Sequence, residues 1–250
     1  MSQIPFIQNL NGIPTLYVHG KPFFALSGEL HNSSASSLDY MAKNVWPNLK
    51  GLNMNAVILP LYWETIEPTE GRYDFTLLDG LVAQARENGM HLIFLWFGLW
   101  KNSESMYVPQ WMKTDTDTYF RVRKVNGEPI NTISPLCAAA VEKDAQAFSV
   151  VMAHIRDIDR EQSTVIFMQV ENEIGVMGAE RDYGSEANDL FERRFPPRRP
   201  SASASPAPGG RLSARTRRNP LWRGILPVPW RRSPPPAGRS IPFRATPTLG

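Results

Sequence analysis

Short runs that are almost entirely apolar, separated by longer amphipathic stretches, most constrain how this chain can fold. The runs lie at residues 23–27, 56–60, 91–97 and 165–170. A strand that is apolar on both sides is buried on both faces, as in parallel sheets covered by helices. Between the runs, apolar side chains recur every three or four residues, as on one helix face, at residues 38–50, 77–85 and 138–159. This order predicts an α/β fold in which helical crossovers join parallel strands.

Two architectures are compatible with these four strand-and-helix steps. One is an open, doubly wound sheet, and the other is part of an eight-stranded (β/α)8 TIM barrel. Nucleotide-binding sheets carry a glycine-rich loop after a strand, but neither G-x-G-x-x-G nor G-x-x-x-x-G-K-[ST] follows any of the runs. We therefore expect an incomplete TIM barrel, in which residues 1–191 form about the first four βα units.

The composition changes abruptly at residue 192. The whole chain has 27 Lys and Arg against 24 Asp and Glu, a net charge of +3. Residues 192–250 contain 13 Arg, no Lys and a single acid, Glu192, and they hold 13 of the 22 prolines. Their net charge is +12, which leaves −9 for residues 1–191. A segment so rich in Arg and Pro, without an apolar period, cannot build a core, so we expect a disordered tail.

Two origins of residues 192–250 are open. Arg, Pro, Ala and Gly have GC-rich codons whereas Lys has AT-rich ones, so the sudden loss of Lys favours a GC-rich gene read in a shifted frame. The alternative is a basic arm that binds nucleic acid. Aromatic residues do not alternate with the arginines in a regular way, as they would in a stacking platform for bases. We therefore expect no nucleic-acid partner.

The cysteine, histidine and hydropathy patterns exclude several other classes of protein. Cys137 is the only cysteine, so no intramolecular disulfide can form. The four histidines show no metal-ligand spacing, and we expect neither a metal nor a cofactor. The longest apolar stretch, residues 92–97, is too short to cross a bilayer. Residues 1–12 lack the pattern of a signal peptide, so the expectation is a cytoplasmic protein without membrane contact.

Acidic and aromatic side chains follow the last three apolar runs. They are Trp63 and Glu64, Trp100 and Glu104, and Glu171-Asn172-Glu173. The carboxyl ends of parallel strands meet at one edge of the sheet, where α/β enzymes carry their active sites. Indole rings stack on sugars, while carboxylates bind hydroxyls and transfer protons. The pattern predicts a sugar site in which Glu171 and Glu173 point to the same side if strand pairing continues that far. An exposed acidic loop is the alternative.

Residues 169–175, QVENEIG, resemble the Q-V-E-N-E-aromatic-G motif of glycoside hydrolase family 35, the β-galactosidases. Other motifs of that family occur in the same order over roughly residues 10–190. Residues 27–31 (SGELH) are similar to S-G-x-x-H, residues 63–68 (WETIEP) to W-N-x-H-E-P, and residues 71–75 (GRYDF) to G-x-Y-D-F. Glu104 stands where the family has the Glu of its C-A-E-W segment.

The resemblance implies a (β/α) barrel that hydrolyses terminal β-galactosides with retention, using two glutamates. It implies that Glu173 is the general acid/base, that Asn172 binds the sugar next to the scissile bond, and that Glu104 holds ring hydroxyls. We expect Glu171, Trp63 and Trp100 to contribute further substrate contacts. The substrate would be a β-galactoside oligo- or polysaccharide. No cofactor is implied.

Several positions depart from the family motifs. Glu64 replaces the Asn after Trp, Ile66 the His before Glu-Pro, Ile174 the aromatic residue, and Ser34 the usual Arg after the S-G-x-x-H segment. These changes indicate a divergent branch, for which galactosides of plant xyloglucan type are as suitable as lactose-like ones.

The resemblance also places the nucleophile at the end of a seventh strand, far downstream of Glu173. No Asp or Glu follows Glu192, so residues 193–250 cannot supply it. We therefore expect the polypeptide as written to be truncated and inactive. The alternatives are a non-catalytic carbohydrate-binding remnant and a nucleic-acid binder that acts through its basic tail.

Overall fold

The computed structural model describes residues 4–195, which all lie in the first of two units of the chain, Met1–Arg198 and Arg199–Gly250. The disordered tail was expected at residues 192–250: its first three residues lie in a helix, and the part from residue 196 onward is outside the described residues. The last described helix, α7 (Ser185–Arg194), spans the position at which the composition changes.

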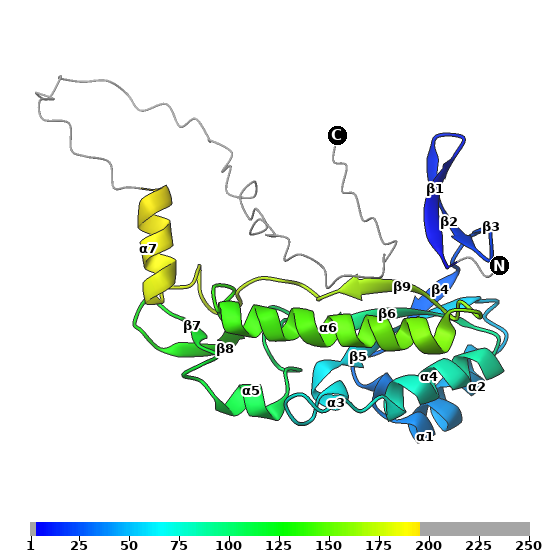
Figure 1. The fold of residues 1–250 in the computed structure, drawn as a ribbon, viewed down its shortest axis with the longest axis horizontal. Coiled ribbons are helices and arrows are strands. Elements are labelled where there is room, and N and C mark those ends of the chain that lie inside the picture. Colours follow the sequence, from blue (N-terminus) through cyan, green and yellow to red (C-terminus); the bar gives the residue numbers. More distant parts are fainter. Residues whose placement is uncertain (1–3, 196–250) are drawn as a thin grey trace, which may run out of the picture. The chain divides into compact units, whose positions relative to one another are not determined.

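A four-stranded parallel sheet forms the centre of the described residues, as the apolar runs predict (Figure 1). Its strands, in spatial order, are β4 (Ser27–Glu29), β5 (Ala56–Tyr62), β6 (His91–Phe97) and β9 (Val165–Val170). Each crossover contains helices, so the chain has a mixed α/β fold. All strands run in the same direction, and their carboxyl ends therefore lie at one edge of the sheet.

The first predicted strand, at residues 23–27, is not a single strand. Lys21–Phe23 form β3 of an antiparallel meander with β1 (Phe6–Leu10) and β2 (Ile13–Val18), and β4 begins only at Ser27. Between them the side chain of Asn55 takes the place of a strand neighbour. Its Oδ1 accepts the Leu26 N–H at 2.9 Å, and its Nδ2 donates to the Phe24 carbonyl at 2.9 Å.

The helix predicted at residues 38–50 is interrupted. It consists of α1 (Leu38–Tyr40), a π-helical segment η2 (Met41–Val45) and α2 (Trp46–Leu49), after a 3-10 turn η1 (Ser34–Ser36). Pro47 explains the interruption, because proline has no N–H for the helical hydrogen bond to the preceding turn.

The other two predicted helices match the structure closely. They are α4 (Thr76–Glu87) and α6 (Ala138–Asp159). The remaining elements are short: α3 (Trp63–Ile66), α5 (Gln110–Thr114), and a hairpin of β7 (Arg121–Arg123) and β8 (Pro129–Ile133).

The core lies between the sheet and the helices that cover one of its faces (Figure 1). Leu81 of α4 and Phe94 of β6 are fully buried there, and Trp96 packs against Phe148 of α6. On the opposite face, the strand register places Ile93 next to Phe167, whose side chain is 48% exposed. Within the described residues this face carries no helix layer, and both β4 and β9 have only one strand neighbour.

Candidate active site

The loops that follow β6 and β9 are joined by short hydrogen bonds at the carboxyl edge of the sheet. Lys101 Nζ donates to Asn172 Oδ1 at 2.6 Å. The backbone N–H and the hydroxyl of Ser103 both donate to the Glu173 carbonyl at 2.9 Å. The next residue, Glu104, pairs with the Lys101 backbone in both directions, at 2.8 and 3.0 Å. The structure therefore fixes the backbones of Glu104, Asn172 and Glu173 to one another.

The carboxyl groups of Glu104 and Glu173 make no hydrogen bond or ion pair with any other residue between 4 and 195. Glu173 is exposed and Glu104 is half-buried. Two glutamates at this edge are thus free to contact a ligand.

Glu171 differs sharply from Glu173, although only one residue separates them. Its side chain is buried, with 6% exposed. Its Oε1 accepts the Leu99 N–H at 3.0 Å, and its Oε2 accepts the Trp100 N–H at 2.7 Å. Both glutamates have positive φ angles, +63° for Glu171 and +51° for Glu173. Strand pairing ends at Val170, so strand alternation does not place the two acids on the same side.

The partner of Glu171 is the half-buried Asp144, which the sequence motifs did not single out. Asp144 lies on α6, is hydrogen-bonded to Glu171, and accepts the Trp96 Nε1–H at 2.8 Å. Burial and the closeness of the two carboxyl groups raise the pKa of both Asp144 and Glu171, so that the pair retains one proton at neutral pH. One signal could have revealed Asp144: it is an acid on the buried stripe of α6, four residues after Ala140 and three before Ala147.

The two tryptophans expected to contact a sugar are packing residues in this structure. Trp63 is fully buried, and its Nε1 donates to Glu67 Oε2 at 2.8 Å. Trp100 is 9% exposed, and its Nε1 donates to the Ile133 carbonyl at 3.1 Å. Trp63 therefore presents no open ring face in this structure and Trp100 presents little, and both rings, like Glu171, hold the backbone and side chains around the strand ends.

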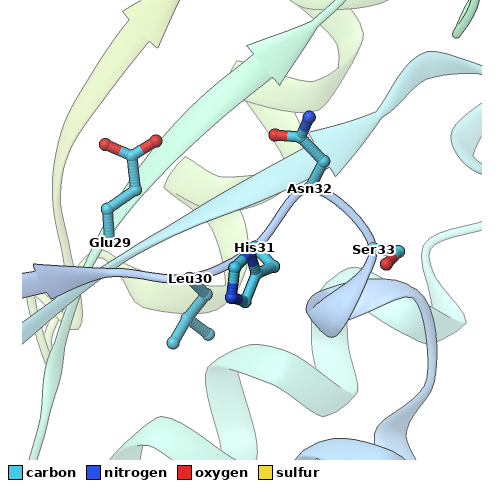
Figure 2. A pocket seen from close by; sticks show the side chains of 5 residues that line it. All are labelled: Glu29, Leu30, His31, Asn32 and Ser33. Carbon is cyan, nitrogen blue, oxygen red and sulfur yellow. The ribbon is translucent and has the colours of Figure 1, made fainter.

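A hollow of about 530 Å³ follows β4, lined by Glu29, Leu30, His31, Asn32 and Ser33. In Figure 2 the side chains of Glu29 and Asn32 point to one side of this segment, and that of Leu30 points to the other. Glu29, Leu30 and His31 belong to the segment that resembles S-G-x-x-H, whereas Asn32 and Ser33 were not expected to line a hollow.

Residues 4–195 contain no cluster of three or more His, Cys, Asp or Glu side chains able to hold a metal ion. Among the same residues, no helix is long and apolar enough to cross a membrane.

The family model described as Glycosyl hydrolases family 35 matches residues 15–203 of the chain. No curated protein matches the chain. Among solved structures, the catalytic domain of a β-amylase from Paenibacillus polymyxa is 10% identical, with a TM-score of 0.46 over 58% of this chain and 36% of its own. The exo-β-1,4-mannosidase Op5Man5 from Opitutaceae bacterium strain TAV5 is 18% identical, with a TM-score of 0.43 over 61% of this chain and 25% of its own. The chain therefore spans well under half the length of either structure.

Proposed function

Since the chain belongs to the glycosyl hydrolases of family 35, we propose that it is the N-terminal part of a retaining glycosidase that acts on terminal β-galactosides. The observation that carries the proposal is the free carboxyl of Glu173 next to an Asn172 whose amide is held in one orientation. An acid and an amide at the end of a parallel strand suit protonation of a glycosidic oxygen and recognition of the adjacent hydroxyl.

Each of the three residues has a distinct proposed role. Glu173 is the general acid/base, and its exposure leaves it accessible to a leaving group. Asn172 accepts a hydrogen bond from Lys101 at Oδ1, so its NH2 group remains free to donate to a sugar hydroxyl. Glu104 binds ring hydroxyls through a carboxylate that has no partner among the described residues.

The described sheet supports the proposal that residues 1–191 are part of a larger barrel. A TIM barrel closes with eight strands, while this sheet has four, an edge at β4 and another at β9. The exposed Phe167 lies on the face that a closed barrel would bury. We propose that further strands complete the barrel and supply the nucleophile, which retaining enzymes hold about 5–5.5 Å from the acid/base.

The 250 residues themselves contain no acid after Glu192. We therefore propose that this polypeptide does not hydrolyse β-galactosides. The test is turnover of 4-nitrophenyl β-galactoside by the purified chain and by its Glu173→Gln variant. Turnover that is lost in Glu173→Gln would contradict inactivity while supporting the role of Glu173.

The coding DNA beyond codon 191 provides the second test. If another frame continues with alternating strand and helix patterns and a Glu at a later strand end, the protein read in that frame is the enzyme. In that protein Glu173→Gln should lower kcat/KM about 10²- to 10⁴-fold, the range for loss of general acid/base catalysis.

A second candidate function is sugar binding without hydrolysis. It is favoured by the presence of Asn172 and Glu104 in a chain without the nucleophile. It predicts saturable binding of a β-galactoside that is lost in Asn172→Ala, with no release of product.

A further inference from the structure

Four residues from two strand ends and one helix form a cluster behind the candidate site, in which Asp144 is half-buried and the others are buried. Trp96 Nε1 donates to Asp144 Oδ1 at 2.8 Å, and Asp144 is hydrogen-bonded to Glu171. The chain passes this point at Gly98, where a Cβ atom would overlap the side chains of Trp96, Asp144 and Glu171. The cluster thus requires glycine at that position.

The hydrogen bonds within the cluster indicate which carboxyl group carries a proton. Two ionised carboxylates cannot hydrogen-bond to each other, so the bond between Asp144 and Glu171 requires a proton on one of them. Both oxygens of Glu171 already accept backbone N–H groups, from Leu99 at 3.0 Å and Trp100 at 2.7 Å. Among residues 4–195, Asp144 accepts a hydrogen bond only from Trp96, so a proton on Asp144 satisfies every donor and acceptor of the cluster.

We propose that a protonated Asp144 is the positioning residue of the candidate site. It donates to an ionised Glu171, whose two oxygens accept the backbone N–H groups that lead into the loop after β6. The next residue along that loop is Lys101, which fixes the amide of Asn172. The placement of Asn172 therefore depends on a helix residue outside the strand-end loops that form the site. This inference rests on the proposed function, in which Asn172 binds the sugar. The hydrogen bonds of the cluster can nevertheless be tested without a sugar.

Two isosteric variants of the 250-residue chain separate the partners. Asp144→Asn replaces the O–H with an amide N–H that donates to Glu171, and it keeps an oxygen for Trp96. Glu171→Gln instead directs an amide N–H against the N–H of Leu99 or Trp100 and loses an acceptor.

Amide hydrogen exchange at residues 99 and 100 reports the difference. We expect exchange to accelerate at least about tenfold in Glu171→Gln and to stay within about threefold of the wild type in Asp144→Asn. An equal acceleration in both variants, or none in Glu171→Gln, would overturn the proposal.

Isotope-edited infrared spectroscopy of the wild type keeps the proposal testable if a variant does not fold. With 13C-labelled aspartate, a protonated-carboxyl stretch should shift at neutral pH. If it shifts with labelled glutamate instead, the proton lies on Glu171 and the proposal is overturned. Titration with methyl β-galactoside separates this inference from the proposed function. If the exchange and infrared results are as expected but no sugar binds, the positioning role of Asp144 is supported and only the proposed function is contradicted.

Discussion

Lys101 Nζ lies 2.6 Å from Asn172 Oδ1 and 4.8 Å from the centre of the Phe97 ring, in a side chain that is only 7% exposed. Among residues 4–195 it forms no ion pair with a carboxylate. A carbonyl oxygen and an aromatic face therefore stabilise its charge. Lys101 therefore holds the Asn172 amide with its oxygen toward the lysine and its NH2 group away from it.

Replacing Lys101 tests this relationship. In Lys101→Met the Asn172 amide loses its charged donor and can rotate. We expect the affinity for methyl β-galactoside to fall about 10- to 100-fold, since a hydrogen bond to a charged group contributes about 1.5–3 kcal/mol. Isothermal titration calorimetry measures the loss. The matched control is Lys43→Met, which removes an exposed lysine paired with Asp39 and should bind like the wild type. Unchanged affinity in Lys101→Met would show that Asn172 is oriented by something else.

Arg86 links α4 to the end of α6 and to the residue that precedes β9. Its guanidinium donates to Asp159 Oδ1 at 2.7 Å, the Ile158 carbonyl at 3.0 Å and Thr164 Oγ1 at 2.9 Å. The other oxygen of Asp159 accepts the Val165 N–H at 2.7 Å, and Asp159 is 5% exposed. Arg86→Met would leave a buried carboxylate without its partner.

We expect Arg86→Met to lower the free energy of unfolding by about 3–5 kcal/mol, the usual cost of breaking a buried ion pair. Urea denaturation followed by circular dichroism measures it. Lys43→Ala breaks the exposed pair with Asp39 and should cost no more than about 1 kcal/mol. If the two variants lose the same stability, burial does not strengthen the Arg86 contacts.

The sequence predicted those helices and strands whose hydrophobic pattern alone indicates how they are buried. The runs at residues 91–97 and 165–170 are β6 and β9, and the period at residues 138–159 is α6. They were predictable because an apolar run or a helical period reports burial directly. The interruption of the helix at residues 38–50 could not be predicted in this way. The apolar residues keep their helical period there, although Pro47 removes one helical hydrogen bond.

Features that depend on distant partners could not be read from local patterns. Asn55 interrupts the first predicted strand from 29 residues away along the chain, by binding Leu26. The sequence does not distinguish Glu171 from Glu173. Contacts with Asp144 on α6 and with the backbone of Leu99 and Trp100 make Glu171 the buried acid. Trp63 precedes acidic residues as a sugar-binding ring would, but the tertiary packing buries it.

Adding a methyl group at Gly98 tests how tightly the cluster of Trp96, Asp144 and Glu171 is packed. Gly98→Ala places a methyl group against Trp96, Asp144 and Glu171, whose hydrogen bonds fix their positions. We expect a loss of about 1–3 kcal/mol of unfolding free energy, typical of overpacking. Gly80→Ala is the control, because its methyl group meets only the flexible side chain of Leu38 and it lies inside α4, where Ala favours the helix. Differential scanning calorimetry should show a lower Tm for Gly98→Ala than for Gly80→Ala, and the reverse order would contradict the packing argument.

The carboxyl pair predicts how stability changes with pH. The ordinary pKa of Glu is 4.5, whereas burial raises the pKa at which the pair of Asp144 and Glu171 loses its shared proton to about 10. Between these values the folded chain holds a proton that the unfolded chain has released, so stability should fall as the pH rises from about 5 to about 9. One proton sets an upper limit of about 1.4 kcal/mol per pH unit. The groups that face the pair are Trp96 and two backbone N–H groups, and neither carboxyl forms an ion pair with another residue between 4 and 195.

Asp144→Asn isolates this contribution from the other titrating groups of the chain. The variant has no proton to share, because its amide donates to Glu171 at every pH in the range. The urea midpoint should therefore fall less steeply with pH in Asp144→Asn than in the wild type, and the two curves should diverge between pH 5 and about 9. Parallel curves would mean that the pair holds no extra proton in the folded chain, and the positioning role of Asp144 would then have no protonated carboxyl to depend on.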